Sequence, residues 1–147
     1  MRISIGSDHA GYDYKSLIIA HIQSLGHTVI DHGTADNSSV DYPDFVHPVA
    51  RDIIEGQADY GVLICGTGNG VAMTANKYPE IRCGLCWNED ISKLTRQHNN
   101  ANVIAMPARF VDIVSAKSMV SAFLTTDFEG GRHERRVNKI TEGLFSC

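Results

Sequence analysis

The segment of this sequence best suited to carry out chemistry is a cysteine followed by three evenly spaced glycines. The segment Cys65–Gly70 reads Cys-Gly-Thr-Gly-Asn-Gly and directly follows an apolar run. Because glycine has no side chain, several backbone N–H groups can converge there on one anion. A helix starting after the segment would also favour the thiolate form of Cys65. The pattern predicts a reactive cysteine beside an anion-binding loop, although a buried cysteine before a tight turn explains the same residues.

The glycine segment does not match the phosphate-binding loops of nucleotide enzymes. It lacks the lysine and the serine or threonine of a P-loop, and Val71 stands where the dinucleotide pattern requires glycine. No short pairing of cysteine and histidine with zinc spacing occurs elsewhere. We therefore expect no nucleotide cofactor and no metal.

Two further cysteines, Cys83 and Cys86, have the spacing of a redox pair. They lie inside the apolar run Ile81–Trp87, which predicts a strand, and residues three apart on a strand point to opposite faces. A redox pair belongs at the start of a helix, so we expect both cysteines to be packing residues. Four cysteines in the chain are too few for a disulfide scaffold, which fits a reducing cytoplasm.

A basic cluster lies near the end of the chain, where Arg132 and Arg136 are four residues apart. On a helix they would share one face and repel each other by roughly a few tenths of a kcal/mol unless an anion lay between them. Guanidinium groups match the oxygens of a phosphate, so a phosphate site fits this pattern. A solvated basic face paired with Glu129 or Glu134 fits it equally well.

Other polar residues are weaker candidates. Asp8 and His9 follow the first predicted strand and could bind sugar hydroxyls, but both residue types are common in turns and caps. His98 lies near the end of a predicted helix and could be a surface cation there. Tyr42 stands before Pro43 and could simply pack at a helix start.

Apolar runs alternate with helical patterns along the chain, which predicts a parallel sheet with helices on both faces. We expect strands at Arg2–Ile5, Thr28–Ile30, Tyr60–Cys65, Ile81–Trp87 and Asn102–Met106. We expect helices at Tyr14–Leu25, Pro43–Glu55, Asn88–His98, Asp112–Leu124 and Arg132–Leu144. Ligands of such folds bind outside the carboxyl ends of the strands, where the glycine segment and Asp8 are expected to lie.

Length and charge limit the class of protein. The 147 residues predict a single domain over 1–147, and a net charge of −4 gives no general attraction to nucleic acid or anionic lipid. No apolar run approaches the length of a membrane span, and the first residues do not form a signal peptide. We expect a cytoplasmic protein without nucleic-acid or membrane partners.

In order and spacing, the motifs resemble the RpiB/LacAB family of sugar-phosphate isomerases. The resemblance spans nearly the whole chain and is carried by Gly6–Gly11, Asp41–Pro43, Ile64–Gly70, Ala75–Lys77, Arg96–Asn99 and Gly130–His133. It implies a Rossmann-like three-layer α/β/α sandwich with a five-stranded parallel sheet. It also implies a homodimer or a dimer of dimers with shared active sites, a phosphorylated sugar as substrate, and no cofactor.

The activity implied by the resemblance is aldose–ketose isomerisation of D-ribose 5-phosphate and D-ribulose 5-phosphate through an enediolate. Relatives act on allose or galactose 6-phosphates, so a six-carbon substrate is the alternative. A cysteine-dependent hydrolase or transferase and a non-catalytic phosphosugar-binding module remain as rival classes. A hydrolase or transferase would form a covalent adduct at Cys65, whereas an isomerase exchanges substrate hydrogen with solvent.

The resemblance also implies roles for individual residues. Cys65 would be the base that moves a proton between C2 and C1, and Thr67 and His98 would open the furanose ring. The enediolate would be bound by Gly66, Gly68, Asn69 and Gly70. The sugar would be held by Asp8, Tyr42 and Asn99, and the phosphate by His9, Arg109, Arg132 and Arg136. Of these, His98, Asn99 and Arg109 are expected to come from a neighbouring subunit.

Overall fold

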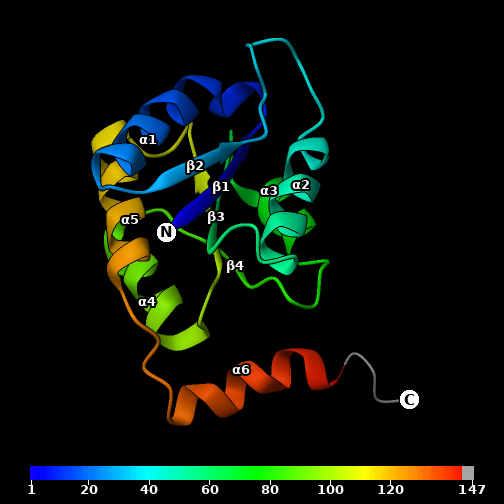
Figure 1. The fold of residues 1–147 in the computed structure, drawn as a ribbon, viewed down its shortest axis with the longest axis vertical. Helices are drawn as coiled ribbons and strands as arrows, with labels where there is room; N and C mark the ends of the chain where they lie inside the picture. Colours follow the sequence, from blue (N-terminus) through cyan, green and yellow to red (C-terminus); the bar gives the residue numbers. More distant parts are fainter. Residues whose placement is uncertain (144–147) are drawn as a thin grey trace.

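The computed structural model describes residues 1–143, which form one parallel sheet between two layers of helices (Figure 1). The strands are β1 (Arg2–Ser7), β2 (Thr28–Asp31), β3 (Tyr60–Cys65), β4 (Cys83–Leu85) and β5 (Val103–Pro107). They lie in the order β2-β1-β3-β5-β4. The expected α/β/α sandwich with a five-stranded parallel sheet is confirmed.

The described residues form one 3-10 helix and six α-helices, and some of them start at a residue whose side chain caps the helix. They are the 3-10 helix η1 (His9–Gly11), α1 (Tyr12–Ser24), α2 (Pro43–Ile54), α3 (Asn69–Ala75), α4 (Glu89–Asn99), α5 (Ile113–Thr125) and α6 (Arg132–Glu142). Asn88 and Asp112 cap α4 and α5 by accepting backbone N–H groups three residues on, at 2.8 and 2.9 Å. The predicted terminal helix is α6, and Leu144, its predicted last residue, lies outside the described residues.

The two faces of the sheet have separate apolar cores. Helices α1, α4 and α5 cover one face, and α2 and α3 cover the other (Figure 1). Alternation along β3 sends Val62 and Ile64 to the first core and Leu63 and Cys65 to the second. Cys65 is therefore fixed on the α2–α3 side at the carboxyl end of a central strand.

Cys83 and Cys86 belong to opposite cores, as their spacing predicts. Burial raises the pKa of Cys83 far above its usual range and raises the pKa of Cys86 to about 12. Both are free thiols that stay protonated at neutral pH. The packing role predicted for this pair agrees with these surroundings.

The edge strand β4 is shorter than predicted, covering three residues of the run Ile81–Trp87. On its outer side a side chain takes the place of a neighbouring strand. Asn76 Nδ2 donates to the carbonyl of Cys83 at 2.9 Å, and the N–H of Cys83 donates to Asn76 Oδ1 at 2.8 Å. The N–H of Arg82 likewise donates to Asn102 Oδ1 at 2.8 Å. The Asn76 amide thus pairs the outward-facing backbone groups of Cys83, for which the sheet offers no further strand.

The strand order places a crevice at the carboxyl ends of β1 and β3, where successive strands are added in opposite directions. Backbone hydrogen bonds join the loops that meet there. Asp8 N donates to Ile64 O, Ala108 N to Cys65 O and Arg109 N to Gly66 O, at 3.2, 2.9 and 3.1 Å. The loops after β1, β3 and β5 consequently form one connected wall.

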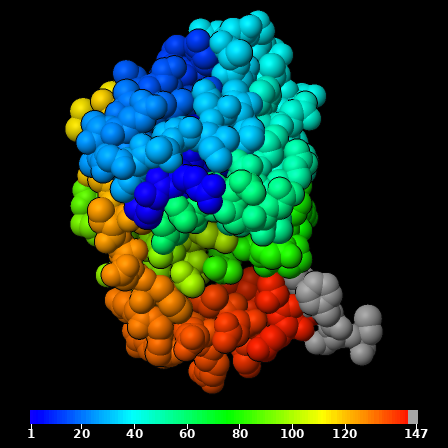
Figure 2. All heavy atoms as spheres, viewed as in Figure 1, coloured from blue at the N-terminus to red at the C-terminus, as the bar shows by residue number. Residues whose placement is uncertain are grey.

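Helix α6 lies at the other end of the sandwich, beside α4 (Figure 1). In the space-filling view it forms a band across the bottom of the molecule (Figure 2). None of the helices over residues 1–143 combines the length and the hydropathy needed to cross a bilayer.

Candidate active site

The Cys65 pocket is a cavity of about 250 Å³ at the carboxyl ends of β1, β3 and β5. It is lined by Asp8, His9, Ala10, Tyr42, Cys65, Gly66, Thr67, Gly70 and Arg109. All of these except Ala10 were predicted as site residues from the sequence. The topology therefore gathers a thiol, a carboxylate, an imidazole, a phenol and a guanidinium around a single cavity.

Within this pocket the thiol of Cys65 is held by the glycine loop. Its side chain is nearly buried, with the residue 4% exposed, and Sγ accepts a hydrogen bond from the N–H of Gly68 at 3.1 Å. Gly68 has φ +73° and precedes the first residue of α3, so the loop turns back and directs this N–H at the sulfur. The arrangement suits a sulfur that accepts and returns a proton.

Tyr42 and Arg109 close over the two ends of the glycine loop. A Cβ on Gly66 would lie 3.2 Å from Nε of Arg109, and one on Gly70 would lie 2.6 Å from Cζ of Tyr42. These two glycines are therefore needed for close approach of the flanking side chains. The alternation of glycines in the sequence serves packing of the pocket wall as well as exposure of backbone N–H groups.

Gly68→Ala is expected to lower the free energy of unfolding by about 3 kcal/mol and to reduce activity. A Cβ at this position would lie 2.4 Å from Cδ1 of Leu85, and the backbone is left-handed. The matched control is Gly56→Ala, where φ is +70° but no atom lies within 4 Å of the new Cβ. Urea titrations should give the control a loss of only about 1 kcal/mol. Equal losses in the two variants would mean that the Leu85 side chain moves aside for the new Cβ and that the loop is not tightly packed.

Asp8 and His9 are held by local hydrogen bonds. Asp8 Oδ1 accepts the N–H groups of Ala10 and Gly11 at 2.9 and 3.1 Å, so this carboxylate caps η1 while it lines the pocket. His9 Nδ1 accepts the N–H of Val40 at 3.3 Å. Because Nδ1 is an acceptor, the neutral ring carries its proton on Nε2. His9 is thereby prepared to donate a hydrogen bond from Nε2.

Four of the remaining predicted residues lie elsewhere, at the far end of the sandwich. The His98 pocket is a hollow of about 500 Å³ lined by His98, Asn99, His133, Arg136, Val137 and Ile140. Arg132 adjoins it, because its Nε lies 3.4 Å from Nε2 of His133. Helix α4 runs antiparallel to the strands, so its last turn faces away from their carboxyl ends. Within one chain, His98, Asn99, Arg132 and Arg136 are separated from Cys65 by roughly the length of the strands, about 15–20 Å.

Two predicted residues of the glycine loop, Gly68 and Asn69, do not line the Cys65 pocket. Asn69 lines a separate surface hollow together with Met73 and Lys77, and its N–H donates to Thr67 Oγ1 at 3.3 Å. Gly68 is buried behind Cys65. The N–H groups of both residues donate within the loop itself, to Cys65 Sγ and Thr67 Oγ1.

Arg109 was expected to enter the site from a neighbouring subunit, but the structure places it in the Cys65 pocket of its own chain. The reason is the position of β5 directly beside β3, which brings the residue after β5 against Gly66. The expectation for Arg109 is therefore wrong in this respect.

Two residues that had no predicted role, Glu129 and His133, lie against His98. The imidazole rings of His98 and His133 are stacked, with centroids 4.2 Å apart and planes at 8°. Glu129 Oε2 lies 3.5 Å from Nε2 of His133 and 4.0 Å from Nε2 of His98. The sequence held no signal for this contact, because Glu129 lies before the Gly130-Gly131 turn and outside α6.

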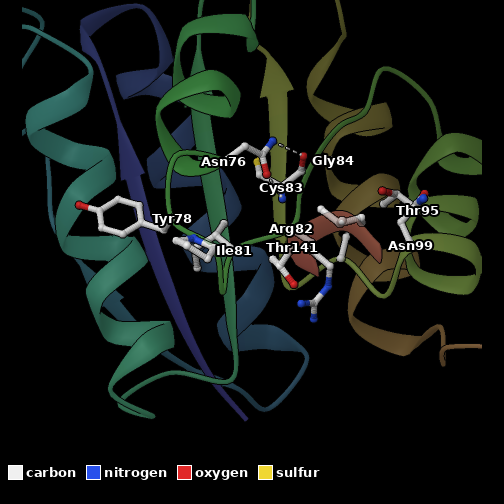
Figure 3. Close-up of a pocket in the computed structure, with 12 residues that line it drawn as sticks. Asn76, Tyr78, Ile81, Arg82, Cys83, Gly84, Thr95, Asn99 and Thr141 are labelled. Carbon is white, nitrogen blue, oxygen red and sulfur yellow. Dashed lines mark hydrogen bonds between the residues drawn. The ribbon is translucent and has the colours of Figure 1, made fainter. Parts of the chain in front are cut away.

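A further hollow of about 360 Å³ lies between the β4 edge and α6 (Figure 3). Its wall includes Tyr78, Ile81, Thr95 and Ile140, and Asn99 is the predicted site residue that it contains. The Arg82 side chain at its rim donates from Nε to the carbonyl of Asn100 at 2.9 Å. Cys83 also lines this hollow, but burial raises the pKa of its thiol far above the usual range, so the hollow does not suit proton transfer.

Comparisons with known proteins agree with this geometry. The sequence model of the family described as Ribose/Galactose Isomerase matches residues 3–140. Ribose-5-phosphate isomerase B of Escherichia coli (strain K12) is 43% identical over 140 residues, which cover 95% of this chain and 94% of that protein.

Two solved structures are also similar to this chain. Ribose-5-phosphate isomerase B of Clostridium thermocellum has 44% identity and a TM-score of 0.96, covering 99% of this chain and 100% of that one. The enzyme of the same name from Mycoplasma genitalium, solved with bound ribulose-5-phosphate, has 40% identity and a TM-score of 0.94. That match covers 99% of this chain and 97% of the other.

Proposed function

The chain belongs to the ribose/galactose isomerase family, and we propose that it interconverts D-ribose 5-phosphate and D-ribulose 5-phosphate with Cys65 as the base. It is an aldose–ketose isomerase, as its relatives are. The observation that carries the assignment of the base is the position of the Cys65 sulfur. It lies in the strand-end pocket, accepts the N–H of Gly68, and is surrounded by groups able to bind a sugar.

The reaction requires a base that moves one proton between adjacent carbons, donors for the oxygen that becomes negative, and an anchor for the substrate. Cys65 is the base, and it takes the proton from C2 and returns it to C1. Backbone N–H groups of the glycine loop stabilise the enediolate, and Asp8 and Tyr42 orient the hydroxyl groups. His9 and Arg109 offer donors to the phosphate from the same pocket.

A complete site requires a second copy of the chain. The ring-opening residue His98 and the phosphate ligands Arg132 and Arg136 lie at the opposite end of the sandwich from Cys65. We therefore infer a homodimer, alone or as half of a dimer of dimers, in which the His98 pocket of one chain faces the Cys65 pocket of the other. This arrangement supplies the acid–base pair and the full phosphate site that one chain keeps apart.

Arg136→Ala and Arg132→Ala are each expected to raise KM for ribose 5-phosphate about tenfold or more, because each removes a charged hydrogen bond worth about 1.5–3 kcal/mol. The matched control is Arg135→Ala, which removes an exposed guanidinium from the same helix between the two. Steady-state kinetics should leave the control at the wild-type KM. An equal KM in all three variants would mean that Arg132 and Arg136 form a solvated basic face and do not bind the phosphate.

The assignment of substrate and reaction is tested by one set of assays. The purified protein with EDTA is supplied with ribose 5-phosphate, ribulose 5-phosphate, allose 6-phosphate and galactose 6-phosphate, and kcat/KM is compared. We expect the five-carbon pair to give the highest values and EDTA to have no effect. Higher kcat/KM for a six-carbon sugar would reassign the substrate, and binding without turnover would make the chain a phosphosugar-binding protein.

We also propose that the enzyme works in a reducing cytoplasm. Among the residues that the structure describes, Cys65, Cys83 and Cys86 are free thiols. The proposed base must remain reduced to transfer a proton, so an oxidising compartment would inactivate the enzyme.

A further inference from the structure

The imidazole of His98 rests on a second histidine that the proposed mechanism does not use. The His98 side chain is 38% exposed, whereas that of His133 is only 8% exposed. Their rings are almost parallel, with centroids 4.2 Å apart. One face of the His98 ring is thus covered by a buried, flat side chain, while the rest remains open toward solvent.

His133 is fixed by the backbone around it. Gly130 and Gly131, with φ of 65° and 55°, turn the chain into α6, and the N–H of His133 donates to the carbonyl of Gly130 at 3.0 Å. The segment before them is tied to the end of α4. Glu129 N donates to Gln97 O, and Arg96 Nε donates to Thr126 O, both at 3.1 Å. The ring of His133 is consequently held against the turn of α4 that carries His98.

His98 itself lacks a comparable anchor. Its polar neighbour within residues 1–143 is Glu129, whose Oε2 lies 4.0 Å from Nε2 of His98, too far for a hydrogen bond. An exposed imidazole can rotate about two side-chain bonds. Stacking on His133 is therefore the contact that restricts its orientation.

The cluster does not suit a metal ion, although its potential ligand atoms lie within 4.8 Å of one another. Imidazole lone pairs lie in the ring plane, so two parallel stacked rings direct them side by side and not toward one point. In addition, Nε of Arg132 lies 3.4 Å from Nε2 of His133, which puts a guanidinium where a cation would bind. The geometry therefore favours a role for the stacked rings themselves over a role in metal binding.

Burial, together with the charges of His98 and Arg132, lowers the pKa of His133. The neutral ring can accept the Arg132 N–H at Nε2 and keeps its proton on Nδ1. His133 thus stays uncharged near neutral pH and does not compete with its neighbour for a proton. An uncharged, flat and immobile ring is a suitable support for an imidazole that exchanges protons.

We propose that His133 is a positioning residue for His98, whose ring it holds in the orientation needed to open the furanose ring of the substrate. The proposal rests on the proposed function, in which His98 acts on the cyclic sugar. His133 does not touch the substrate and acts through the stack.

The test compares His133→Ala, which removes the supporting ring, with His133→Phe, which keeps a flat ring of similar size. His133→Ala should lower kcat for ribose 5-phosphate about tenfold, whereas His133→Phe should stay within about threefold of wild type. Deuterium exchange from solvent into C1 of ribulose 5-phosphate needs no ring opening and should be unchanged in both. Glu134→Gln, an exposed change on the same helix, serves as control and should match wild type throughout.

A structural readout separates this proposal from the function on which it rests. The ring protons of His98 should carry a ring-current shift in the NMR spectrum that disappears in His133→Ala and persists in His133→Phe. Loss of exchange in parallel with turnover, with a lower Tm, would make His133 a folding residue and overturn the proposal. Unchanged kcat and unchanged shifts in His133→Ala would overturn it as well. If His98→Asn itself left ribose 5-phosphate turnover intact, the role of His98 would be wrong, while the shifts would still report whether His133 holds its ring.

Discussion

Cys65→Ala is expected to lower kcat about 10³-fold or more in both directions and to abolish deuterium exchange at C1 of ribulose 5-phosphate. Both follow from the same cause, because without the sulfur no group in the Cys65 pocket moves the proton between C2 and C1. The pocket lining is otherwise kept, so substrate binding measured by calorimetry should change little. Turnover is measured with coupled assays, and exchange by NMR in deuterated buffer.

The matched control for this variant is Cys83→Ala. Cys83 packs against the same core of the sheet as Cys65, but it lies on the edge strand β4, away from the pocket. Its removal should affect stability modestly and leave kcat unchanged. Near-wild-type kcat in Cys65→Ala would mean that Cys65 is not the base. A covalent adduct between Cys65 and substrate in the wild-type enzyme would favour a hydrolase or transferase instead.

His98→Asn is expected to lower kcat for ribose 5-phosphate about 10²-fold or more while largely sparing deuterium exchange at C1 of ribulose 5-phosphate. The aldose must open its furanose ring before its C2 proton becomes acidic, and an imidazole can transfer the protons that opening requires. The ketose cannot close such a ring, because its O5 carries the phosphate. Exchange is preferable to reverse turnover as a control, since the equilibrium constant ties kcat/KM in the two directions. Equal loss of turnover and exchange would place His98 in the proton transfer itself or in folding.

Mixed dimers of these two variants test whether the site is shared. Co-refolding equal amounts of Cys65→Ala and His98→Asn chains should restore about one quarter of wild-type activity, because half the dimers are mixed and each mixed dimer holds one intact site. Each variant refolded alone serves as control. If both residues acted from one chain, mixing would restore nothing.

Much of the fold was predictable from the sequence because its signals are local. The apolar run Tyr60–Cys65 and the helix starts at Asn88 and Asp112 correspond to the observed β3, α4 and α5. The pairing of Asn76 with the outer edge of β4 was not predictable, because it joins a side chain to the backbone of Cys83, seven residues further on. No periodicity in the run Ile81–Trp87 records the presence of that side chain.

The candidate site was predictable in part for a similar reason. Residues directly after strands, such as Asp8 and Cys65, meet at one edge of a parallel sheet whatever the details of packing. The division into two pockets depends instead on the direction of α4 and on the path that carries α6 to the far end of the sheet. His133 had no signal as a support for His98, because stacking of two rings is a property of the packed helices.

The sequence by itself determined the fold class, and it predicted Cys65 as the base and the kinds of groups proposed to bind a phosphosugar, because residue type, strand-end position and glycine spacing can be read along the chain. Only the tertiary structure decided which of these groups share a cavity. It put Arg109 beside Cys65 through the pairing of β3 with β5, and it put His98 and Arg136 at the opposite end. The physical reason is that local propensities fix elements, whereas distances between elements follow from how the two cores pack against the sheet.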